Sequence, residues 1–282
     1  MRKLQILFAF FSLILCEKLS ESEDQERVKQ CGQPGKDSTG EPSWAVQLRL
    51  TSTQSQPNGG GTPAVLVSKR HVLAAGWNAI GVNNQTKEWE WIDGKAIELR
   101  TQCKDDVIQL PKHLLKNYKI HLSTCKNKDL CGTSILRNVV LGHYIGICDP
   151  ELGIFGVILL EISYEVPSDV DYFRPVCVSS DKKSPDDGTA GELQFYSTTD
   201  NVIRKTSGKT VKCTDSRRLN SMLCASNCGS GSLSIKDGEK ETAIGISMEN
   251  ENNQQCGQSK SVSTGYYRTK ICDLAGICRS SS

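Results

Sequence analysis

Short apolar segments rich in Val and Ile recur along the chain between clusters of Gly, Asn, Ser and Asp. Short runs bounded by turn-forming residues are typical of strands rather than helices. Because these segments are numerous and fairly evenly spaced, they predict an all-β fold of packed antiparallel β-barrels or sandwiches. The clearest predicted strands are residues 45–50, 64–75, 139–147, 154–162, 174–179, 193–198 and 243–248.

Helical patterns occur in two places. One is 111–118 (PKHLLKNY), which begins at a proline, and the other is the tail at 263–278. Residues 17–30 are polar and rich in charge, and we interpret them as a flexible lead-in. No repeat with a period of 20–50 residues is present, which argues against a solenoid or a propeller.

The N-terminal residues have the pattern of a secretory signal. A basic start, Met1-Arg2-Lys3, precedes an apolar run from Leu4 to Cys16, after which the sequence turns polar at once. This run is short for a membrane span and has the length of a signal core, although a buried helix is an alternative. We therefore expect a signal peptide within residues 1–20, with its cleavage site open, and a secreted, extracellular protein with no membrane span.

Charge excludes some partners. Arg2, Lys3 and Lys18, offset by Glu17, account for the whole formal net charge of +2, so the remainder of the 282 residues is neutral. Binding to nucleic acid or to an anionic membrane requires clustered positive charge. The hydrophobic fraction of 37% is sufficient for a packed core. We expect a protein partner, whose identity the sequence does not give, and no nucleic acid.

Cysteine usage agrees with export. Of thirteen cysteines, Cys16 lies in the expected signal, and the remaining twelve are an even number. On an exported chain this indicates up to six disulfides. Zinc is the competing interpretation, but the sequence has no pair of Cys-x-x-Cys motifs and its four histidines are scattered, so we expect no metal and no cofactor. Asn84, in the sequon Asn-Gln-Thr, is a predicted glycosylation site.

Several segments, in order, resemble the trypsin-like (chymotrypsin-fold) serine proteases. They resemble the entry strand, the strand before the catalytic histidine, the aspartate strand, and the segments around the nucleophile. The resemblance covers roughly residues 31–278 and implies two packed antiparallel Greek-key barrels, divided near 165–180, with a short C-terminal helix. The ending resembles that of a nematode-expanded trypsin-like family of unknown function. The segments are PSWAVQL (42–48), AVLVSKRHVLAAGW (64–77), GVILLEI (156–162), RPVCV (174–178), MLCA (222–225), CGSGSLSI (228–235), AIGISM (243–248) and KICDLAGIC (270–278).

The catalytic positions of this family do not carry catalytic residues here. Aligned on the motifs, Gly76 takes the position of the histidine, Gly156 that of the aspartate, and Gly229 that of the serine. Acyl transfer of this kind needs a nucleophile, a base within hydrogen-bond reach and a group that orients the base. Ser230 is a weak alternative nucleophile, because Gly-Ser-Gly after a cysteine is more often simply a turn. His71 is interpreted as a packing residue.

Two further parts of the machinery are altered. The nucleophile motif is about three residues short after Cys228, which removes a glycine of the oxyanion hole and the aspartate that pairs with a new N-terminus. Residues 32–43 contain no Arg-Ile-Val-Gly-Gly activation signal. By the same alignment Ser226 forms the floor of the specificity pocket, so no acidic group is expected there.

The resemblance also implies three disulfides, namely Cys31–Cys177, Cys213–Cys224 and Cys228–Cys256. The other six cysteines leave 15 possible pairings. They are Cys103, Cys125, Cys131, Cys148, Cys272 and Cys278.

The leading hypothesis is therefore a secreted, catalytically inactive serine protease homologue that acts through binding. One alternative is an atypical serine hydrolase that uses Ser230 or an unrecognised site. Another is a disulfide-rich structural or decoy protein whose fold serves only as a stable surface.

Overall fold

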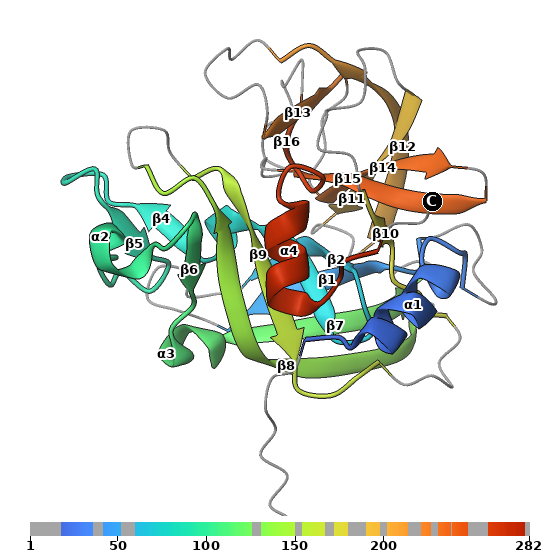
Figure 1. The fold of residues 1–282 in the computed structure, drawn as a ribbon, viewed down its shortest axis with the longest axis horizontal. Helices are drawn as coiled ribbons and strands as arrows, with labels where there is room; N and C mark the ends of the chain where they lie inside the picture. Colours follow the sequence, from blue (N-terminus) through green and yellow to red (C-terminus); the bar gives the residue numbers. More distant parts are fainter. Residues whose placement is uncertain are drawn as a thin grey trace, which may run out of the picture.

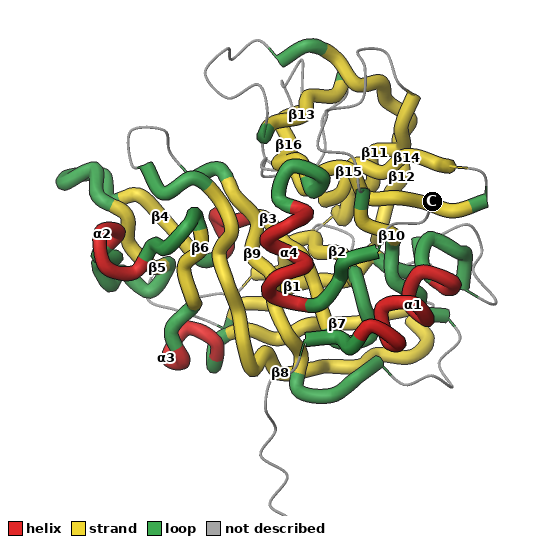
Figure 2. Tube along the Cα trace, in the orientation of Figure 1, coloured by secondary structure: helices red, strands yellow, loops and turns green. Residues whose placement is uncertain are grey.

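Strands make up most of the regular structure in the computed structural model of the chain (Figure 1), and the helices are short and few (Figure 2). The all-β fold expected from the sequence is confirmed. The structure describes residues 18–35, 42–51, 60–125, 131–149, 154–166, 172–179, 190–197, 202–213, 221–226, 231–237, 239–247 and 259–279.

The first barrel is a ring of six antiparallel strands in the order β8-β7-β1-β2-β3-β9, closed by pairing of β8 with β9. Apolar side chains of these strands fill its interior, as in β9, where every residue is buried. The predicted strand at 64–75 is in fact two strands, because the chain turns at residues 68–70. The ring strands are β1 (Ala45–Leu50), β2 (Gly60–Leu66), β3 (His71–Ala75), β7 (Tyr118–Cys125), β8 (Cys131–Gly146) and β9 (Gly156–Ile162).

The second barrel has the same plan. Its order is β15-β14-β11-β12-β13-β16, and pairing of β15 with β16 closes the ring. The short β10 (Cys177–Val178) adds to β15 in parallel and brings the chain over from the first barrel. β14 and β15 of this barrel pack against β2 and β3 of the first. The ring strands are β11 (Ala190–Ser197), β12 (Val202–Val211), β13 (Met222–Ala225), β14 (Gly231–Asp237), β15 (Lys240–Ser247) and β16 (Ser259–Ser263).

A long insert joins β3 to β7. Its tryptophans Trp89 and Trp91 are buried, so the insert has an apolar interior of its own that joins the core. The helix expected at 111–118 is limited to four residues, because the chain enters β7 at Tyr118. The insert contains η1 (Gly76–Asn78), β4 (Ile80–Val82), β5 (Trp89–Trp91), α2 (Leu99–Gln102), β6 (Val107–Gln109) and α3 (Lys112–Leu115).

The interpretation of residues 17–30 as a flexible lead-in was wrong. Glu21–Gln30 form helix α1, and Ser20 caps it: the Ser20 hydroxyl accepts from the N–H of Glu23, and the Glu23 carboxylate accepts from the N–H of Ser20. This reciprocal capping box satisfies two backbone donors that would otherwise lack partners. The face of α1 turned to the protein carries Asp24 and Arg27 rather than apolar side chains, so no hydrophobic period marks the helix.

Asp24 and Arg27 hold the C-terminal segment. The Asp24 carboxylate accepts from Nε of Arg27 at 2.7 Å and from the N–H groups of Cys278 at 2.9 Å and Arg279 at 2.7 Å. Arg27 in turn donates to the Arg279 carbonyl at 2.6 Å. Both side chains are buried, and breaking a buried pair of this kind costs about 3–5 kcal/mol. We call this set of contacts the terminal clamp.

The terminal clamp also includes helix α4 (Arg268–Ala275), the C-terminal helix expected from the sequence. The N–H of Leu19 donates to the Ala275 carbonyl at 2.9 Å. Gly276 ends the helix at φ 70°. A β-carbon at Gly276 would lie 2.3 Å from the Leu19 carbonyl oxygen, so the two chain ends are in backbone contact.

The described part of the chain contains four disulfides. Two of them, Cys31–Cys177 and Cys213–Cys224, are bridges that the resemblance implied. The other two, Cys103–Cys148 and Cys272–Cys278, resolve pairings that the sequence left open. Cys228 and Cys256 lie outside the described residues. Cys125 and Cys131 face each other in the backbone register of β7 and β8.

None of the helices in these ranges has both the length and the apolar character needed to cross a membrane.

Because Leu19 and Ser20 contact α4 and cap α1, we expect cleavage of the predicted signal to fall before Leu19, rather than at the residue-20 boundary. Removing Ser20 would take away the cap of α1, and N-cap loss costs about 1 kcal/mol. We expect N-terminal sequencing of the processed chain to begin at or before Leu19. A mature chain that begins at Glu21 or later would contradict this.

Candidate functional site

The two glycines aligned with the catalytic histidine and aspartate lie side by side. Gly76 directly follows β3, and Gly156 is the first residue of β9, which pairs with β3. A β-carbon added at Gly76 would lie 2.8 Å from the Gly156 carbonyl oxygen. Two positions distant in sequence therefore meet at one point, which is the arrangement that a histidine and its orienting carboxylate require.

The ring of Tyr144 fills the space that side chains at these two positions would need. A β-carbon at Gly76 would lie 2.7 Å from Cε2 of Tyr144, and one at Gly156 would lie 2.6 Å from the same atom. Gly146, opposite Gly156 in the register, is equally close to the ring, since its β-carbon would lie 2.6 Å from the tyrosine hydroxyl. We call Tyr144 with Gly76, Gly146 and Gly156 the tyrosine–glycine cluster.

A tryptophan of the insert also packs against the Tyr144 ring. Trp89, on β5, meets Tyr144 edge to face, with ring centroids 5.7 Å apart and an interplanar angle of 83°. Both residues are buried. The tyrosine–glycine cluster is thus part of the packed core, and neither glycine has a side chain that could accept or orient a proton.

His71, the first residue of β3, has a structural role. His71, at the other end of β3 from Gly76, is buried, and its Nδ1 lies 2.8 Å from the hydroxyl of Ser68. Burial, together with the charge of Arg70, lowers the pKa of His71 to about 3. The imidazole is therefore neutral at physiological pH and packs in the core, as the sequence interpretation held.

The other barrel histidines do not approach the tyrosine–glycine cluster in a catalytic arrangement. His121 lies 3.4 Å from Oε1 of Gln47, between β7 and β1. His143 precedes Tyr144 on β8 and points to the outer face of the barrel, since adjacent side chains of a strand alternate. Burial lowers the pKa of both.

The third catalytic position, Gly229, and the alternative nucleophile Ser230 lie outside the described residues. Ser226, the expected pocket floor, is exposed just beyond β13. Its N–H donates to the Lys209 carbonyl at 2.9 Å, and its hydroxyl accepts from the Lys209 N–H at 3.1 Å. Ser226 therefore joins β13 to β12 and offers no negative charge to a basic substrate side chain.

One group of potential metal ligands is present among the described residues. Sγ of Cys103, Sγ of Cys148 and a carboxylate oxygen of Asp106 all lie within 4.8 Å of one another. The two sulfurs are joined in a disulfide, so they are not available as thiolate ligands. The carboxylate of Asp106 alone does not make a metal site.

Sequence reasoning missed Tyr144. Its ring contacts three glycines, which come from β8, β9 and η1. No sequence motif indicates a contact between residues so far apart in the chain. The one available signal was the spacing of Tyr144 and Gly146, which lie two residues apart on β8, the strand that pairs with β9.

The close packing around Gly156 predicts that Gly156→Ala lowers the stability of the protein more than Gly81→Ala does. Gly156→Ala would place a methyl group 2.5 Å from the Ile145 carbonyl oxygen as well as against Tyr144, and overpacking of this kind costs about 1–3 kcal/mol. Gly81→Ala in β4 is the matched control, because its nearest neighbours lie at 3.9 Å. Urea unfolding should show a loss of stability for Gly156→Ala alone, and equal stabilities would contradict the assigned packing.

Comparison with known proteins agrees with this geometry. No curated protein matches the chain. A solved structure, that of the scabies mite inactivated protease paralogue S-I1, shares the fold, with a TM-score of 0.55 at 14% identity, over 86% of this chain and 98% of that one. The profile of the Nematode trypsin-6-like family matches residues 3–278. The chain is therefore a member of the Nematode trypsin-6-like family, a family of trypsin-like protease homologues.

Proposed function

We propose that this protein is a secreted, catalytically inactive serine protease homologue that acts by binding. The observation that carries the proposal is the tyrosine–glycine cluster, in which a buried ring fills the space of a general base and its orienting group. Members of a catalytic triad act as a unit, so a chain that lacks two of them is expected to retain little catalytic activity even if the third is present. The scabies mite protein that shares this fold is an inactivated protease paralogue, which favours the same interpretation here.

Export is supported by two separate features. The N-terminal sequence has the charge and length of a secretory signal. The described residues contain four disulfides, of which Cys31–Cys177 and Cys103–Cys148 join segments 146 and 45 residues apart, and such bridges persist in oxidising compartments.

The decisive experiment is labelling with a fluorophosphonate probe, which reacts with activated serines. We expect the purified mature protein to remain unlabelled under conditions that label active trypsin stoichiometrically, because neither Gly76 nor Gly156 has a side chain that could act as the base or orient it. Ser230→Ala is the matched control. Labelling of the unmodified protein that disappears in Ser230→Ala would establish a hydrolase and overturn the proposal.

Asn84 is the proposed glycosylation site, and its position suits that modification. It is exposed in the turn between β4 and β5. The side chain of Asn83, and not that of Asn84, holds this turn by accepting from the N–H groups of Gln85 and Thr86. The amide of Asn84 is thus left facing solvent at the tip of a hairpin.

A pair of substitutions at one residue tests the glycan. Thr86→Ala destroys the sequon and should lower the mass of the secreted protein by one N-glycan, whereas Thr86→Ser keeps the sequon and should keep the glycan. Intact-mass measurement before and after glycosidase treatment reads out both. A glycosidase shift that survives in Thr86→Ala would place the glycan elsewhere.

A further inference from the structure

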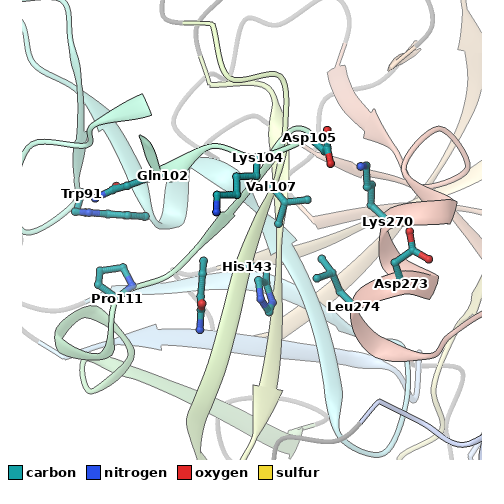
Figure 3. A pocket seen from close by; sticks show the side chains of 11 residues that line it. Trp91, Gln102, Lys104, Asp105, Val107, Pro111, His143, Lys270, Asp273 and Leu274 are labelled. Carbon is teal, nitrogen blue, oxygen red and sulfur yellow. The ribbon is translucent and has the colours of Figure 1, made fainter. Parts of the chain in front are cut away.

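A groove of about 580 Å³ crosses the outer face of the first barrel between the insert and helix α4 (Figure 3). Val107 of β6 and His143 of β8 line its middle, and Leu274 of α4 lines one side. Its volume lies in the range of ligand sites, roughly 300–1,000 Å³. We call it the outer groove, and it is separate from the tyrosine–glycine cluster, which lies inside the barrel.

Disulfides and hydrogen bonds next to the outer groove hold its two walls in place. The Cys103–Cys148 disulfide ties the insert to the end of β8. On the other wall, the Cys272–Cys278 disulfide and the terminal clamp fix α4, and Nη1 of Arg268 donates to the Ile277 carbonyl at 2.6 Å. A groove with fixed walls loses little conformational entropy when a ligand binds.

Apolar surface alternates with charge along the outer groove. Val107, Leu274 and Trp91 supply apolar surface. In Figure 3 the ammonium of Lys270 lies at the same end as the carboxylates of Asp105 and Asp273, whereas the ammonium of Lys104 lies on the insert side of Val107. The α4 end therefore carries a net charge of about −1 and the insert side about +1.

These four charged side chains are available to a ligand. Among the described residues none of them takes part in an ion pair. Burial lowers the pKa of His143, which favours its neutral form. Equal numbers of lysines and aspartates argue against nucleic acid, which requires net positive charge.

The shape favours an extended chain over a small molecule. Lys104, Asp105 and Asp273 are exposed, so the outer groove is open along its length and would not enclose a compact ligand as small-molecule sites do. An extended peptide directs every second side chain to the same face. Acidic, apolar and basic side chains at alternate positions would thus meet Lys104, the apolar floor and the two aspartates in turn.

We propose that the outer groove binds an extended segment of a partner protein with the pattern acidic-x-apolar-x-basic. This rests on the proposed function, because a protease homologue without catalytic residues acts through the surfaces it presents. The charge pattern sets the direction of the bound segment, with its basic side chain toward α4. The Val107 side chain and the Leu274 side chain receive the apolar residue.

The test selects a phage-displayed library of random dodecapeptides on the secreted, disulfide-bonded protein. Enriched peptides should carry the acidic-x-apolar-x-basic pattern. Synthetic copies should bind Lys104→Glu and Asp273→Lys about three- to tenfold more weakly than the unmodified protein, as expected for reversed charges at a solvent-exposed rim. Lys112→Glu and Glu88→Lys are matched controls outside the outer groove, and they should leave the affinity unchanged.

Charge exchange completes the test. A peptide with its acidic and basic residues interchanged should recover affinity for the double variant Lys104→Glu, Asp273→Lys. Absence of enriched peptides, enriched peptides insensitive to both single variants, or failure of the interchanged peptide would each overturn the proposal. These outcomes are independent of fluorophosphonate labelling, so failure of the outer groove and failure of the proposed function are distinguishable.

Discussion

The packing of Tyr144 against three glycines is the constraint on which the first barrel depends. β8 and β9 close the ring, and their register pairs Gly146 with Gly156 beside the tyrosine ring. β3 ends at the same point, and the insert contributes Trp89 in an edge-to-face contact worth about 0.5–1.5 kcal/mol beyond its buried area. Barrel closure and the start of the insert thus meet at one contact. The tyrosine ring leaves no room for a side chain at Gly76 or Gly156, so the size of these two residues and the packing of the barrel are linked.

One strand supplies both an interior contact and an exterior surface. Because side chains alternate along β8, Tyr144 enters the core while His143, its neighbour, lines the outer groove. Cys148, just beyond β8, is bonded to Cys103 of the insert, which forms the wall of the outer groove opposite α4. The strand that places Tyr144 in the core therefore also forms part of the outer groove.

The sequence was most informative where structure follows local pattern. Alternation and turn residues located β1 and β9, and ordered motifs predicted the double barrel and two of the disulfides. Contacts between distant residues gave no such signal. Helix α1 was missed because Asp24 and Arg27, rather than apolar residues, form its buried face. The insert strands were missed because β4, β5 and β6 are three residues each and are ordered by tertiary contacts.

The terminal clamp has a consequence for the order of folding. The buried side chains of Asp24 and Arg27 pair with each other within helix α1, but their backbone partners, Cys278 and Arg279, are synthesised between 252 and 255 residues later. A ten-residue helix is marginal by itself in water. These contacts of α1 therefore form only after residues 278 and 279 have left the ribosome, whereas domains commonly fold from the N-terminus during synthesis. A chain truncated before residue 278 would leave a buried ion pair without its backbone partners.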